Sequence, residues 1–166
     1  MAEQRIENTI HDALKGDAKE LALEFVAYLR ANEIPIEDAE NYWDVQYNGK
    51  TVCFIYIDGS EAKPGPWTIW SDQEPGSWVS WADGKRTSIC KKVSVDEDIK
   101  TIAWANANFC ESCGGDCSPG KQKTILGKPF EGVCSSAIAF TNPNADMVRC
   151  AKEMVLARKN DILASK

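Results

Sequence analysis

Four cysteines gathered in the second half of the chain carry its clearest chemical signal. They are Cys110, Cys113, Cys117 and Cys134, four of the seven cysteines in 166 residues. The first two form a C-x-x-C pair that two glycines follow directly. Two thiolates in such a turn can bind one metal ion, and the glycines let backbone N–H groups approach the sulfur atoms. The spacing predicts a four-cysteine zinc site, which is structural because a closed set of thiolates leaves no position for a substrate.

Other interpretations of these cysteines stay open. The thiols could remain free and reduced, or Cys110 and Cys113 could exchange as a thiol redox pair. An iron–sulfur cluster is a further alternative, although C-x2-C-x3-C matches neither common ferredoxin spacing. A complete set of internal disulfides is disfavoured, because the number of cysteines is odd and the chain shows no export signal. Three further cysteines stand in apolar or amphipathic stretches and are expected in the core: Cys53, Cys90 and Cys150.

A tryptophan pattern occurs twice in the middle of the chain. Residues 64–72 read PGPWTIWSD and residues 75–83 read PGSWVSWAD. Two copies are too few for a solenoid, so we interpret them as the strands of a hairpin. In this hairpin Trp70 would lie opposite Trp78, and Trp67 opposite Trp81.

The two tryptophan pairs would occupy opposite faces of the sheet, because they are an odd number of residues apart. One face would supply the core, which is where most tryptophans are found. The other face would bind a small aromatic or cationic ligand. The sequence therefore predicts that Trp67, Trp70, Trp78 and Trp81 line a binding face. A surface for a partner protein is the alternative.

Charge and hydropathy restrict the other functions. The net charge is −6, and residues 1–83 hold 6 basic and 16 acidic side chains. This acidic half would repel a phosphate backbone, so we expect no nucleic-acid partner. The longest apolar run, residues 52–57, is far shorter than the ~18 residues of a membrane span, and the N-terminus lacks the apolar region of a signal peptide. We therefore expect a cytoplasmic protein with no membrane partner. A single histidine leaves no nucleophilic triad, which favours a non-enzymatic role.

The first half of the chain predicts two helices and a hairpin. Apolar residues recur at helical spacing over the first 33 residues, and the second helix should open with an Asp17–Glu20 capping box and end before Pro35. Two β-rich runs then flank Asn48-Gly49. That dipeptide is typical of a type I′ hairpin turn, in which both residues have a positive φ.

The second half predicts strands between two helices. A strand at 86–93 precedes a helix that opens with a Ser94–Glu97 capping box. Strands near KTIL and VCSSAIAF follow, and Asn142-Pro143 leads into an amphipathic last helix. Together these elements predict a single α+β domain over residues 1–166. Its sheet is largely antiparallel and built from hairpins, with two N-terminal helices, a middle helix and a C-terminal helix.

Residues 109–140, FCESCGGDCSPGKQKTILGKPFEGVCSSAIAF, followed by Thr141-Asn142-Pro143, resemble a group of small bacterial proteins of Firmicutes type. The shared features are a C-x-x-C-G loop, a P-G-K-x-K-T-I-x-G-K-x-F run and a later cysteine. This resemblance covers about the last 60 residues and implies no particular activity. The α+β plan and aromatic content are also similar to the effector-binding domains related to gyrase inhibitors, which bears on the fold alone.

Overall fold

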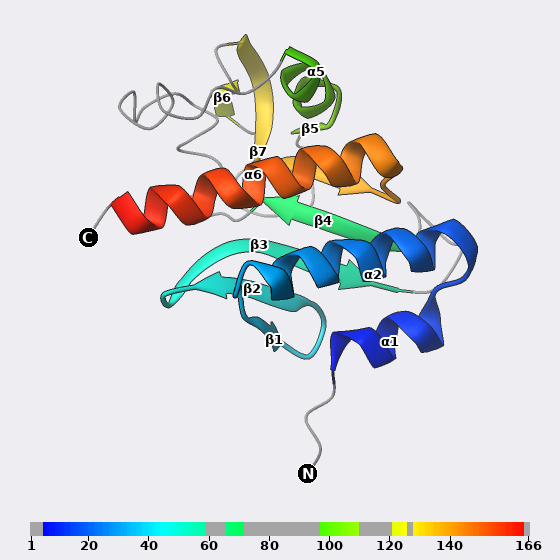
Figure 1. The fold of residues 1–166 in the computed structure, drawn as a ribbon. Coiled ribbons are helices and arrows are strands. Elements are labelled where there is room, and N and C mark those ends of the chain that lie inside the picture. Colours follow the sequence, from blue (N-terminus) through cyan, green and yellow to red (C-terminus); the bar gives the residue numbers. More distant parts are fainter. Residues whose placement is uncertain (1–4, 59–65, 72–96, 110–120, 126–127, 165–166) are drawn as a thin grey trace.

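The computed structural model describes residues 5–58, 66–71, 97–109, 121–125 and 128–164 (Figure 1). The helices in these ranges are α1 (Ile6–Ala13), α2 (Gly16–Ala31), α5 (Glu97–Ala105) and α6 (Ala145–Ala164). The strands are β1 (Ile36–Asp38), β2 (Trp43–Tyr47), β3 (Lys50–Ile57), β4 (Trp67–Ser71), β5 (Ala107–Phe109), β6 (Lys121–Ile125) and β7 (Lys128–Thr141). The predicted strand at 86–93 and the residue Ser94 lie outside these ranges.

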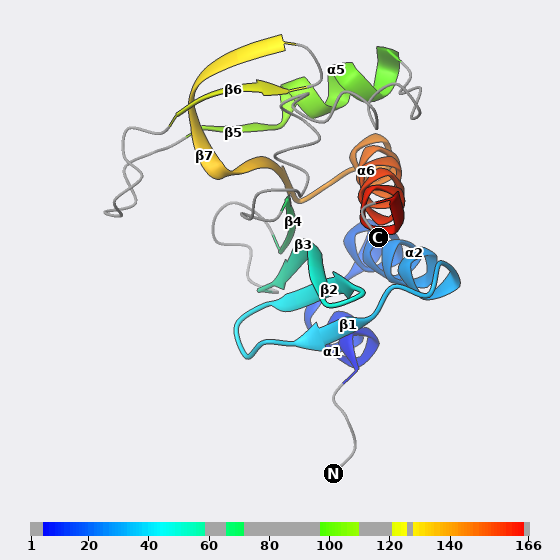
Figure 2. The ribbon, with the colours of Figure 1, turned by 90° about the vertical axis from the view of Figure 1, so that its left-hand side faces the viewer.

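The seven strands form one sheet in the order β1-β2-β3-β4-β7-β5, and β6 also pairs with β7. Every pairing between these strands is antiparallel. Figure 2 shows β7 running from the region of β5 and β6 down to β4, so that this one strand joins β5 and β6 to the rest of the sheet. The predicted α+β fold with an antiparallel sheet and packed helices is confirmed.

The hairpin between β2 and β3 forms around Asn48-Gly49, as the sequence predicts. Asn48 has φ 50° and Gly49 has φ 74°, so both turn residues adopt the left-handed conformation that this turn requires. Tyr47 pairs with Lys50 across the turn, and the register shifts once between Val45 and Gln46. This local signal positions the two strands that carry part of the candidate site.

The core lies between the sheet and the helices α2 and α6, which run along one face of β3 and β4 (Figures 1 and 2). Alternate residues of the strands point into it, including Ile55, Trp67 and Ile69. Phe25 of α2 and Val155 of α6 are fully buried in the same cluster. Each such side chain contributes about 1.5–3 kcal/mol on burial. The amphipathic patterns predicted for these helices are borne out by this packing.

Two details at the helix starts differ from the sequence-based expectations. Helix α2 begins at Gly16, and its N-cap residue Lys15 makes no side-chain capping bond, so the predicted Asp17–Glu20 capping box is wrong. Leu14 and Lys15 are extended and connect α1 to α2, and Gly16 then has a left-handed φ of 58°, which glycine adopts without strain. Helix α6 begins two residues after Pro143, because the Oδ1 atom of Asn144 caps it by accepting a hydrogen bond from the Met147 N–H at 2.9 Å.

Replacing Gly49 by alanine should destabilise the fold by about 1–2 kcal/mol, because an L residue at a left-handed φ is strained. A Cβ built at this position meets no atom within 4 Å, so backbone strain is the whole expected effect. Urea titration would give the free energies of unfolding of G49A and of the control K50A. Lys50 is the neighbouring residue and is exposed. Equal stabilities of the two variants would contradict the turn geometry.

Candidate functional site

Strand β4 places its two tryptophans on opposite faces of the sheet. Trp67 is 0% exposed and belongs to the core, whereas Trp70 is half-buried on the face turned away from that core. The odd separation of the two residues produces this arrangement, because successive strand side chains alternate between faces. Of these two predicted ligand contacts, Trp70 is therefore the one on the accessible face, and Trp67 packs inside. Trp78 and Trp81 lie outside the described residues.

The predicted pairing between the two tryptophan repeats is wrong. Phe54 of β3 and Ala139 of β7 lie opposite Trp70, so both edges of β4 are occupied at this residue. Trp67 likewise lies opposite Ile57, and its carbonyl accepts a hydrogen bond from the Asn142 N–H at 2.8 Å. No edge of β4 remains for the register that would set Trp70 against Trp78. The internal repeat predicts that β4 pairs with a strand close in sequence, whereas in the structure it pairs with β7.

Four aromatic side chains gather on the second face of the sheet, and we call them the aromatic face: Tyr42, Phe54, Tyr56 and Trp70. Tyr56 and Trp70 are stacked, with ring centroids 5.9 Å apart and an interplanar angle of 26°. Tyr42 meets Phe54 edge-on, at 5.2 Å and 85°. Tyr42 is 39% exposed, and the other three are half-buried. Of these four residues only Trp70 is among the predicted ligand contacts, although the two-residue spacing of Phe54 and Tyr56 places both on one strand face.

A row of directly opposed residues crosses the aromatic face from β1 to β4. Glu37 pairs with Asp44, Asp44 with Phe54, and Phe54 with Trp70. The Oδ2 atom of Asp44 accepts a hydrogen bond from Gln46 Nε2 at 2.6 Å. Its Oδ1 atom is covered from solvent and has no hydrogen-bond partner in the described part of the chain. A buried acceptor without a partner costs about 1–3 kcal/mol, because no hydrogen bond compensates for the loss of its contact with water.

The predicted zinc ligands fall partly outside the described residues. Cys110, Cys113 and Cys117 belong to residues 110–120, which lie outside the described ranges, and Cys134 lies within β7. The residues that flank this segment are Phe109 of β5 and Lys121 of β6, and both pair with Val133. They therefore lie on either side of β7, two strand spacings or about 10 Å apart. Both flanking residues thus lie beside Val133, the residue that precedes Cys134.

Two of the three remaining cysteines are core residues, as predicted. Cys53 and Cys150 are both 0% exposed. The Sγ–H of Cys150 donates to the Ile99 carbonyl at 3.6 Å, and burial raises the pKa of this thiol to about 12. Cys150 is therefore a neutral thiol at physiological pH and an unsuitable metal ligand or nucleophile. Cys90 lies outside the described residues.

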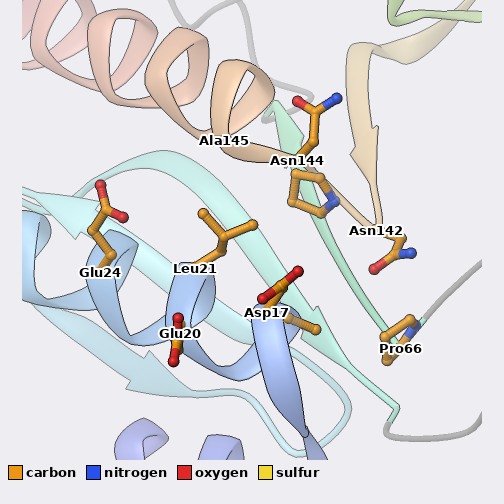
Figure 3. A pocket seen from close by; sticks show the side chains of 10 residues that line it. Asp17, Glu20, Leu21, Glu24, Pro66, Asn142, Asn144 and Ala145 are labelled. Atoms are coloured by element: carbon orange, nitrogen blue, oxygen red, sulfur yellow. The ribbon is translucent and has the colours of Figure 1, made fainter.

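A cleft of about 790 Å³ separates the first turns of α2 from the residues that lead into α6 (Figure 3). Asp17, Glu20 and Glu24 of α2 line one side, and Asn142 and Asn144 line the other. Glu24 is paired with Lys152 of α6. Nowhere in the described ranges do three or more His, Cys, Asp or Glu side chains form a group that could hold a metal ion. The cleft is thus acidic without the arrangement of a metal site.

Among the described helices, none combines the length and apolar character that crossing a bilayer requires. The resemblance of residues 109–143 to a bacterial family stays a prediction. Comparison of the chain with protein-family models, with curated proteins and with solved structures gives no match.

Proposed function

We propose that this chain is a small-molecule-binding protein whose ligand lies against the aromatic face. The stacked pair of Tyr56 and Trp70 carries the proposal, because two half-buried rings on the face opposite α2 and α6 offer a flat apolar contact area. Aromatic side chains bury 150–250 Å² each and favour stacked or edge-on partners with specific geometry. Trp70 and Tyr56 are the residues expected to stack on the ligand.

Zinc is the cofactor we propose, held by Cys110, Cys113, Cys117 and Cys134. Four thiolates form a closed tetrahedral set for this ion, which supplies folding free energy and no reaction. The pairing of both Phe109 and Lys121 with Val133 supports the proposal, since these two residues flank the segment that holds three of the cysteines and Val133 precedes the fourth. The burial of Cys53 and Cys150 supports it further by removing two competing thiols.

Replacing Trp70 by alanine should weaken ligand binding at least about tenfold, because central aromatic contacts dominate binding energy. Three probes with one shared ring are suitable: benzyl alcohol, benzylamine and benzoate, which are neutral, cationic and anionic at pH 7. We expect at least one of them to bind, measured by NMR shift titration.

Trp104→Ala is the matched control, because this half-buried tryptophan lies on α5, away from the aromatic face. Equal dissociation constants for W70A and the unmodified protein would rule out this site. Self-association through Trp70 without binding of any probe would instead favour a protein-interaction surface.

Protein purified without a metal-affinity tag should contain about one zinc per chain by elemental analysis. Cys113→Ser should lose the metal and far more stability than Cys53→Ala, because only the first change removes metal-coupled folding free energy. Thiol titration under native conditions should leave Cys150 unreacted, since its thiol is buried and its pKa is about 12. A folded, metal-free protein in which Cys110 and Cys113 react quickly would support the redox pair and exclude the zinc site.

A further inference from the structure

We infer that the ligand of the aromatic face is a small organic cation and that the Asp44 carboxylate is its counter-charge. This inference rests on the function proposed above and names the chemical class of the ligand. It starts from the row Glu37, Asp44, Phe54 and Trp70, whose members are directly opposed across β1 to β4. Directly opposed residues of antiparallel strands lie on the same face, with their Cβ atoms about 4.5–5.5 Å apart.

The dimensions of this row suit a small aromatic amine. Adjacent strands are about 4.8 Å apart, so Asp44 and Trp70, two strands from one another, are separated by about 10 Å. Phe54 lies between them, and its ring forms an edge-to-face pair with the ring of Tyr42. A ligand that lies along the row would place its charged end at Asp44 and its apolar part between Phe54 and the Tyr56–Trp70 stack.

The charges of the row favour a cation over a neutral ligand or an anion. In the part of the chain that the structure describes, neither Glu37 nor Asp44 forms an ion pair with Lys or Arg. Two carboxylates directly opposite one another repel. An ammonium group beside the two carboxylates would reduce that repulsion, and it would also be attracted to the faces of the adjacent rings. A carboxylate ligand would add a further like charge at the same place.

The probe series distinguishes these ligand classes. We expect benzylamine to bind at least about tenfold more tightly than benzyl alcohol, and benzoate to bind most weakly. In Asp44→Asn the preference for benzylamine over benzyl alcohol should fall to within about twofold, because the charge is removed. The asparagine amide oxygen can still accept from Gln46, so the local hydrogen bond is retained. Glu20→Gln is the control, because it removes an equal charge from an exposed position of α2.

Each outcome decides the inference. Equal affinities for benzylamine and benzyl alcohol, both lost in W70A, would contradict the preference for a cationic ligand and leave the proposed function intact. A preference that survives D44N, or that E20Q abolishes equally, would overturn the role of Asp44. Binding of no probe would overturn the inference and the proposed function together. The order measured on the unmodified protein tests the cation preference even if D44N does not fold.

Discussion

Pairing along the 14-residue strand β7 is the constraint on which the rest of the structure depends. Its last residues close the sheet against β4, and its first residues form the ladder with β6. Gly132 has φ 68° and the registers on both flanks of β7 shift, so the strand bends while it keeps its partners. Because β7 occupies the free edge of β4, it also determines that the second tryptophan repeat cannot pair there.

Side chains of β3 and β4 alternate between the two faces of the sheet, so that one face forms the core and the other carries the proposed ligand site. Ile55, Trp67 and Ile69 face the helices and are buried, whereas Phe54 and Trp70 lie on the other side. The Nε1 atom of Trp67 is buried without a hydrogen-bond partner among the described residues, so this indole contributes through packing alone. One five-residue strand thus supplies a central core residue and the main residue of the proposed ligand site.

Local signals were sufficient for much of the fold, and the candidate site depended on non-local ones. The Asn48-Gly49 turn and the amphipathic character of the last helix follow from residues close in sequence, and both were predicted. The pairing of Trp70 with Ala139 joins segments about 70 residues apart, and no local pattern encodes it. The repeat therefore misled the prediction. Asp44 went unnoticed for the same reason, because its significance arises only when β1 and β3 align beside β2.

The lengths of the terminal strands affect how this sheet behaves toward other copies of itself. The strand order ends at β1 and β5, each only three residues long. A short edge offers few unpaired backbone groups on which another strand could build. The edge strand β1 also carries the adjacent acids Glu37 and Asp38, both exposed, so a second copy approaching this edge would meet its own negative charge. The shortness of β1 and β5, together with the acidic side chains of β1, therefore disfavours edge-to-edge aggregation at these two strands.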